Sequence, residues 1–187
     1  MCEKFVVFPV YHPAERIERM TGISVPLQRT WRARKHLDVS AGPKASLDTL
    51  EACALAARAW AATLGLAPKD SRSLGAAASA SLAYYAVLHG PATLRVRSDR
   101  DTRKAFIQDF IDTDQIARKV AGFDDGEHPA YAIGWIENEP FRLLKSEIDE
   151  DGFEHAIATR KINLLELGDY IAERAVHPLF EIEFQAD

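Results

Sequence analysis

Side chains suited to nucleic-acid recognition gather between residues 25 and 37. Gln28 carries an amide that can pair with adenine, and Arg29 carries a guanidinium that can pair with guanine or bind a phosphate. Three further cationic side chains follow at short spacing, Arg32, Arg34 and Lys35. Contacts to bases give sequence preference, whereas cations on phosphates give affinity that depends on salt. These residue types predict one short surface that meets a nucleic acid.

Two short helices joined by a tight turn are predicted to position these side chains. Pro13 suits the first turn of a helix, and Gly22 suits the left-handed position that ends one. Ser24 is a good N-cap for the second helix, and Pro26 fits its first turn. We expect the second helix to end near residues 36–37.

The start of the second helix is predicted to face base edges. An α-helix fits the major groove of DNA with its N-terminal residues nearest the bases. The residues at this position are Ser24, Val25, Leu27 and Gln28. Arg32, Arg34 and Lys35 lie further along the helix, where the phosphate backbone passes. We also expect contacts from Arg16 on the first helix and from Lys44 in the following loop.

Several of these residues also have structural interpretations. Trp31 is more often a core residue that binds the second helix to the next one than a DNA contact. Arg16 and Arg19 have acidic neighbours in Glu15 and Glu18, with which they can pair. A cluster such as residues 32–35, taken without its helix, is more often a solvated face than a binding surface.

The formal charge of the chain is uneven. The net charge is −5, yet residues 1–48 hold eight Lys and Arg against five Asp and Glu, and the remaining residues hold 15 against 23. An acidic surface repels phosphates. A basic front on an acidic body therefore predicts that a single face meets a polyanion.

Helical spacing dominates the middle of the chain, and strands alternate with helices after it. Ser46 is expected to cap a long helix that ends near residue 64, and an Ala- and Ser-rich helix is expected over residues 76–88. Later strands are predicted at residues 93–97, 131–136, 140–145, 153–159 and 179–184, with helices at 101–120 and 162–175. This order predicts an α+β chain with a DNA-binding domain at 1–74 and, after a helical linker, a small mixed domain within 75–187.

A family pattern runs through the first third of the chain. It consists of an aromatic residue, a short helix starting with Ala, a Thr-Gly-hydrophobic-Ser turn, and a second helix with an Arg, an aromatic and a terminal Leu. Here these are Tyr11, residues 14–20, residues 21–24, Arg29, Trp31 and Leu37. With this pattern residues 11–66 resemble the winged helix-turn-helix DNA-binding domain of the MerR-like superfamily. The resemblance implies a wing at residues 38–45 and a further helix at 46–64.

The sequence departs from the family pattern in three ways. The wing is short and lacks the usual Arg-Tyr pair, Pro26 occupies a position that is often polar, and no long C-terminal coiled-coil helix follows. The resemblance implies the fold, whereas the promoter-twisting mechanism of the family is not expected here. Residues 75–187 resemble no family that we recognise.

These features predict a sequence-specific transcriptional regulator of double-stranded DNA, a repressor in the first interpretation, acting in the cytoplasm. One short recognition helix makes few base contacts, so we expect a homodimer on a symmetric site, formed through the part after residue 75. That part is interpreted as a dimerisation or effector domain, and any small-molecule effector is left open. The terminal strand, residues 180–184, is expected to be an edge for pairing between chains.

Two alternatives and several absences complete the prediction. The alternatives are an excisionase-like or architectural DNA-binding factor of a mobile element, and a protein-interaction module that does not bind DNA. Neither a nucleophile motif, a phosphate loop nor a dinucleotide fingerprint is present, and Cys2, Cys53 and the six His lack metal-ligand spacing. We therefore expect no enzyme, metal or cofactor. Apolar runs are far shorter than the roughly 18–20 residues of a membrane span, so no membrane partner is expected.

Overall fold

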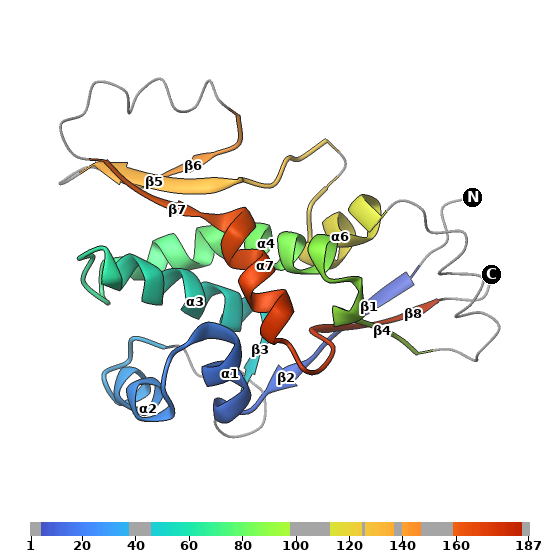
Figure 1. Ribbon diagram of the computed structural model, residues 1–187, viewed down its shortest axis with the longest axis horizontal. Helices are drawn as coiled ribbons and strands as arrows, with labels where there is room; N and C mark the ends of the chain where they lie inside the picture. The colour runs from blue at the N-terminus through green and yellow to red at the C-terminus, as the bar shows by residue number, and fades with distance from the viewer. Residues whose placement is uncertain are drawn as a thin grey trace.

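The computed structural model describes residues 5–37, 46–97, 113–124, 126–136, 140–146 and 159–184. In these ranges six α-helices combine with three small sheets, which confirms the predicted α+β class (Figure 1). The described part holds no helix that is both long enough and apolar enough to cross a membrane.

Helices α1 (Ala14–Thr21) and α2 (Val25–Ala33) confirm the two short helices expected around the turn. The expected end of the second helix near residues 36–37 is wrong, because α2 ends at Ala33 and Lys35 has a left-handed backbone. Gly22 adopts the left-handed conformation, φ 76°, and its N–H donates to the carbonyl of Glu18 at 2.8 Å. The Ser24 hydroxyl accepts from the N–H of Leu27 at 3.4 Å and caps α2. Gly22 therefore ends α1 and Ser24 begins α2, as the sequence predicts.

Helix α3 (Thr49–Thr63) begins later than expected, because Asp48 rather than Ser46 is its N-cap. Asp48 accepts from the N–H of Glu51, and Glu51 accepts from the N–H of Asp48, each at 2.8 Å. The shift follows from a two-stranded sheet in which β3 (Leu47–Asp48) pairs antiparallel with β2 (Tyr11–His12). This pairing keeps the chain extended up to Asp48. The predicted wing, residues 38–45 with Lys44, lies outside the described residues.

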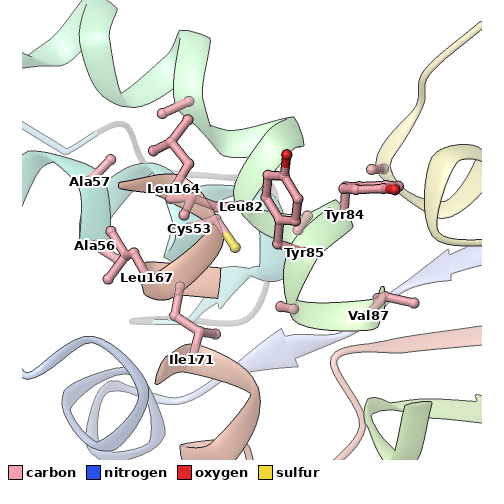
Figure 2. Packing of buried hydrophobic residues seen from close by; sticks show 14 of the residues in the cluster. Cys53, Ala56, Ala57, Leu82, Tyr84, Tyr85, Val87, Leu164, Leu167 and Ile171 are labelled. Carbon is pink, nitrogen blue, oxygen red and sulfur yellow. The ribbon is translucent and has the colours of Figure 1, made fainter. Parts of the chain in front are cut away.

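Helix α4 (Ser71–His89) packs between α3 and α7 (Leu164–Arg174) at very close range. A Cβ on Gly75 would lie 2.5 Å from Cγ of Arg58, and one on Gly168 would lie 2.5 Å from Cβ of Tyr85. Figure 2 shows side chains of α3, α4 and α7 meeting in this buried cluster, among them Cys53, Leu82 and Leu167. The three helices thus share one tightly packed centre.

The first and last described strands belong to one sheet. Strand β8 (Phe180–Phe184) pairs antiparallel with β1 (Phe5–Pro9) and parallel with β4 (Leu94–Val96), which follows a 3-10 turn at Pro91–Thr93. The prediction that β8 is a free edge is therefore wrong, because both of its sides are already hydrogen-bonded. Its pairing with β1 joins segments that are far apart in the sequence.

The second three-stranded sheet has the order β6 (Arg142–Leu144), β5 (Ala132–Ile136) and β7 (Thr159–Asn163). Antiparallel pairing of β5 with β6 confirms the predicted hairpin. Helix α6 (Thr113–Ala121) covers the last part of the helix expected at 101–120 and ends one residue later, while the earlier residues of that helix are outside the described ranges.

The predicted domain division at residue 74 falls inside α4. The main buried cluster contains Phe5, Met20 and Cys53 from one side of that position and Leu82 and Ile182 from the other. The division into residues 1–74 and 75–187 stays a prediction.

Candidate nucleic-acid interface

One side of α2 is anchored in the protein through Gln28. This side chain is 0% exposed, and its Nε2 donates to the carbonyls of Ala14 at 2.9 Å and Ile23 at 2.8 Å. Both amide hydrogens are thus bound to backbone carbonyls, one in the first turn of α1 and one in the turn between the two helices. The prediction that Gln28 reads a base is therefore wrong for this conformation. Gln28 is a brace between α1 and α2.

Trp31 lies on the same anchored side, one turn further along. It is 5% exposed and belongs to a second buried cluster, which also contains Ile17, Ile23, Leu37, Leu47 and Leu55. The structure confirms the core interpretation of this residue. Trp31 and Gln28 together fix which side of α2 faces solvent.

Sequence reasoning missed Arg58, which holds the far end of α2. It lies on α3, is 5% exposed, and has its guanidinium carbon 5.0 Å from the centroid of the Trp31 ring. Its Nη1 donates to the carbonyl of His36 at 2.5 Å and its Nη2 to that of Pro68 at 3.0 Å. A lone Arg at an apolar position of an Ala-rich helix was the signal, since charged residues are rarely buried without partners.

Exposed cations lie on α2 and just after it. Arg29, Arg34 and Lys35 are all exposed, and within the described part of the chain none of them forms an ion pair. Arg32 is half-buried and makes contacts with its surroundings. Arg16 is half-buried on α1. The structure thus leaves three of the predicted cations, Arg29, Arg34 and Lys35, exposed on α2 or just after it.

The remaining predicted contacts, Ser24 and Val25, lie at the start of α2. Both are half-buried, and the Ser24 hydroxyl is used as the N-cap. Their position keeps the beginning of the helix at the surface, next to the exposed Pro26 and Leu27.

Lys35 has an unusual backbone just after α2. Its φ is 56°, the left-handed region, which no other non-glycine residue of the described chain adopts. This conformation costs a residue with a Cβ roughly 1–2 kcal/mol, and Gly is the usual residue at such a helix end. A strained residue that keeps a cation at the surface points to a role for that cation beyond the fold.

A buried polar chain supports the strand before α1. The Nε2 of His12 lies 2.9 Å from Oγ1 of Thr49, which in turn donates to the carbonyl of Leu179. The Thr49 hydroxyl has one proton, which it donates to Leu179, so Nε2 of His12 is the donor in the bond between His12 and Thr49. Burial, together with the charges of Arg16 and His177, lowers the pKa of His12 to about 4. The imidazole is therefore neutral and ties β2 and α3 to the segment before β8.

Other groups with chemical potential are occupied or buried. Burial, with a smaller effect of Asp48, raises the pKa of the Cys53 thiol to about 12, so it is not an ionised nucleophile at neutral pH. The Tyr84 hydroxyl donates to Asp114, which also accepts from Nε of Arg118 at 2.7 Å. Burial and this bond raise the pKa of Tyr84, while the Arg118 bond, helped by the Tyr84 bond, lowers that of Asp114. The cluster joins α6 to α4.

The described residues contain no group of three or more His, Cys, Asp or Glu that could hold a metal ion. The exposed cations of α2 therefore form the strongest candidate site. No protein-family model, curated protein or solved structure matches this chain.

Proposed function

We propose that the chain is a sequence-specific DNA-binding transcriptional regulator whose α2 enters the major groove. The observation that supports this most is that α2 has one buried side and one exposed side. Gln28 and Trp31 hold one side in the protein, while Arg29 on the helix and Arg34 and Lys35 just after it are exposed. Because the helix is anchored, its cations are held in a fixed arrangement. A fixed arrangement of cations favours a polyanion of regular structure over a flexible polyanion.

The charge distribution supports DNA rather than a general polyanion as the ligand. The chain as a whole carries a net charge of −5, so most of its surface repels phosphates. The cations on α2 and just after it are concentrated within seven positions, residues 29–35, a length that fits one groove crossing. Only this side is then suited to approach the duplex.

We further propose that residues 11–66 form a winged helix-turn-helix. The paired strands β2 and β3 lie directly before α1 and directly before α3, and the proposed wing, residues 38–45, falls in the segment between α2 and β3. Lys44 would then contact the flanking backbone of the duplex. The regulator is proposed to act as a repressor.

We propose a homodimer as the active form. A single helix of nine residues, Val25–Ala33, offers few base contacts, whereas two copies on a symmetric site double them. Because β8 is already paired on both sides, the contact between copies has to use another surface of the part after residue 75.

Fluorescence anisotropy with duplexes from the promoter region of the protein's own gene, at several salt concentrations, tests the proposal. We expect Arg29→Ala and Lys35→Ala to weaken binding and each to lower the slope of log affinity against log salt by about 1. Arg142→Ala and Lys145→Ala are matched controls, since both residues are exposed on or next to β6, across α3 and α4 from α2 (Figure 1).

The outcomes separate the alternatives. If Arg29→Ala and Lys35→Ala bind as well as the wild type, the DNA-binding proposal is wrong and a protein-interaction role is favoured. If binding persists but all duplexes bind equally, an architectural factor replaces the regulator. A loss of binding in the Arg142→Ala control as well would show that the effect comes from net charge rather than from α2.

A further inference from the structure

The solvent side of α2 is apolar along its middle. With 3.6 residues per turn, Pro26, Thr30 and Ala33 follow one line, opposite the anchored Gln28 and Trp31. All three are exposed. The cations flank this line, with Arg29 on one side and Arg34 on the other.

Leu27 lies beside this apolar line at the start of the helix, three positions before Thr30. Its side chain is 41% exposed. It lies in the first turn of α2, and the first turn of a helix that enters a groove comes nearest the bases. It shares its flank with Arg34, seven positions later. Its exposure has no explanation in the packing of α2, whose buried side consists of Gln28 and Trp31.

The hydrogen-bonding capacity of this side is small. The amide of Gln28 is turned inward, and the Thr30 hydroxyl donates to the carbonyl of Pro26 at 3.0 Å. Arg29 on α2 and Arg34 just after it supply donors next to the apolar line, and no amide or carboxylate of α2, all of whose residues are described, projects from it. Recognition by this side therefore depends on apolar contact as well as on guanidinium groups.

In the major groove of DNA the apolar group is the C5-methyl of thymine. The other base edges present donors and acceptors, which an apolar side chain desolvates without compensation. Cations on both sides of the apolar line match the phosphates on both sides of the groove.

We infer that Leu27, together with Thr30 and Ala33, recognises thymine methyl groups in the major groove and gives the protein a preference for thymine at the centre of each half-site. This inference rests on the proposed DNA-binding function and names what its helix reads. Leu27 is the specificity-determining residue, and the flanking cations supply affinity.

The test uses a duplex selected with the wild-type protein from a random-sequence library. Each thymine is replaced in turn by deoxyuridine, which keeps base pairing and removes the methyl group. We expect about a fourfold loss of affinity for each methyl that is contacted, since a buried methyl-sized group contributes ~0.8 kcal/mol. Leu27→Ala is expected to bind the thymine and deoxyuridine duplexes equally at the positions that Leu27 contacts.

The controls separate this inference from the function on which it rests. If deoxyuridine leaves wild-type affinity unchanged while Arg29→Ala still weakens binding, the thymine inference is wrong and DNA binding stands. If the wild type binds no duplex, or Arg29→Ala has no effect, the proposed function itself is wrong. If Leu27→Ala instead dissociates an oligomer in sedimentation, Leu27 belongs to a subunit contact and the inference is overturned.

Discussion

The guanidinium carbon of Arg58 lies 5.0 Å from the centroid of the Trp31 ring. Through this contact, a buried cation on α3 meets the core side chain of α2. The same guanidinium donates to the carbonyl of His36, just beyond the end of α2, where a cation is electrostatically favourable. The orientation of α2 on the protein thus depends on one side chain of the neighbouring helix.

Replacing Arg58 by Lys tests this dependence. A Lys cannot reach both carbonyls with a planar group, so we expect Arg58→Lys to lower the free energy of unfolding by about 2 kcal/mol. Denaturant unfolding measures the change, with Arg72→Lys, an exposed position on α4, as the control at under about 0.5 kcal/mol. Equal stability of Arg58→Lys and the wild type would contradict the role given to Arg58.

Gln28→Glu tests the brace between α1 and α2. The change keeps the size of the side chain but puts an acceptor where Nε2 now donates to the carbonyls of Ala14 and Ile23. We expect a loss of about 3 kcal/mol in the free energy of unfolding at neutral pH. Gln115→Glu makes the same chemical change at an exposed position of α6 and is expected to have little effect. Loss of DNA binding without loss of stability would instead restore Gln28 as a base contact.

Lys35→Gly is expected to separate stability from binding. Glycine relieves the left-handed backbone at φ 56°, so the free energy of unfolding should rise by about 1 kcal/mol. Removal of the cation should at the same time weaken DNA binding to the level of Lys35→Ala. Thermal unfolding and fluorescence anisotropy measure the two effects. A Lys35→Gly variant that is more stable and binds DNA as well as the wild type would show that Lys35 makes no phosphate contact.

The buried His12 predicts a loss of stability in mild acid. In the unfolded chain the imidazole binds a proton near its ordinary pKa of 6.5, whereas in the folded protein its pKa is about 4. Between these values the unfolded state binds more protons, so the free energy of unfolding falls as the pH is lowered from 6.5 to 4. The contribution of His12 to this fall is up to about 3 kcal/mol.

Unfolding of His12→Gln across this pH range measures the contribution. The Gln amide can still donate to Thr49 but does not titrate, so the variant should be less stable at pH 7 and show a flatter profile. His128→Gln changes an exposed histidine and should keep the wild-type profile. Parallel profiles for His12→Gln and the wild type would assign the pH dependence to other groups.

Local signals in the sequence predicted the backbone around the candidate site. Gly22 at the end of α1 and Ser24 at the start of α2 act within a few residues of themselves, so their effect does not depend on the rest of the fold. The basic character of residues 29–35 also follows from the sequence alone. The function proposed for these cations stays a prediction.

Tertiary structure decided which side of each element faces inward. By residue type Gln28 is a candidate for reading a base, but its amide donates to the carbonyls of Ala14 and Ile23 in the interior. Apolar residues alternate over residues 180–184, as they do in both edge strands and central strands. Pairing with both β1 and β4 makes β8 a central strand. Such hydrogen bonds join segments that are distant in sequence, and neither residue type nor periodicity specifies the partner. The sequence alone therefore determined the turn, the start of α2 and the charge of this site, whereas long-range contacts determined which side chains remain exposed.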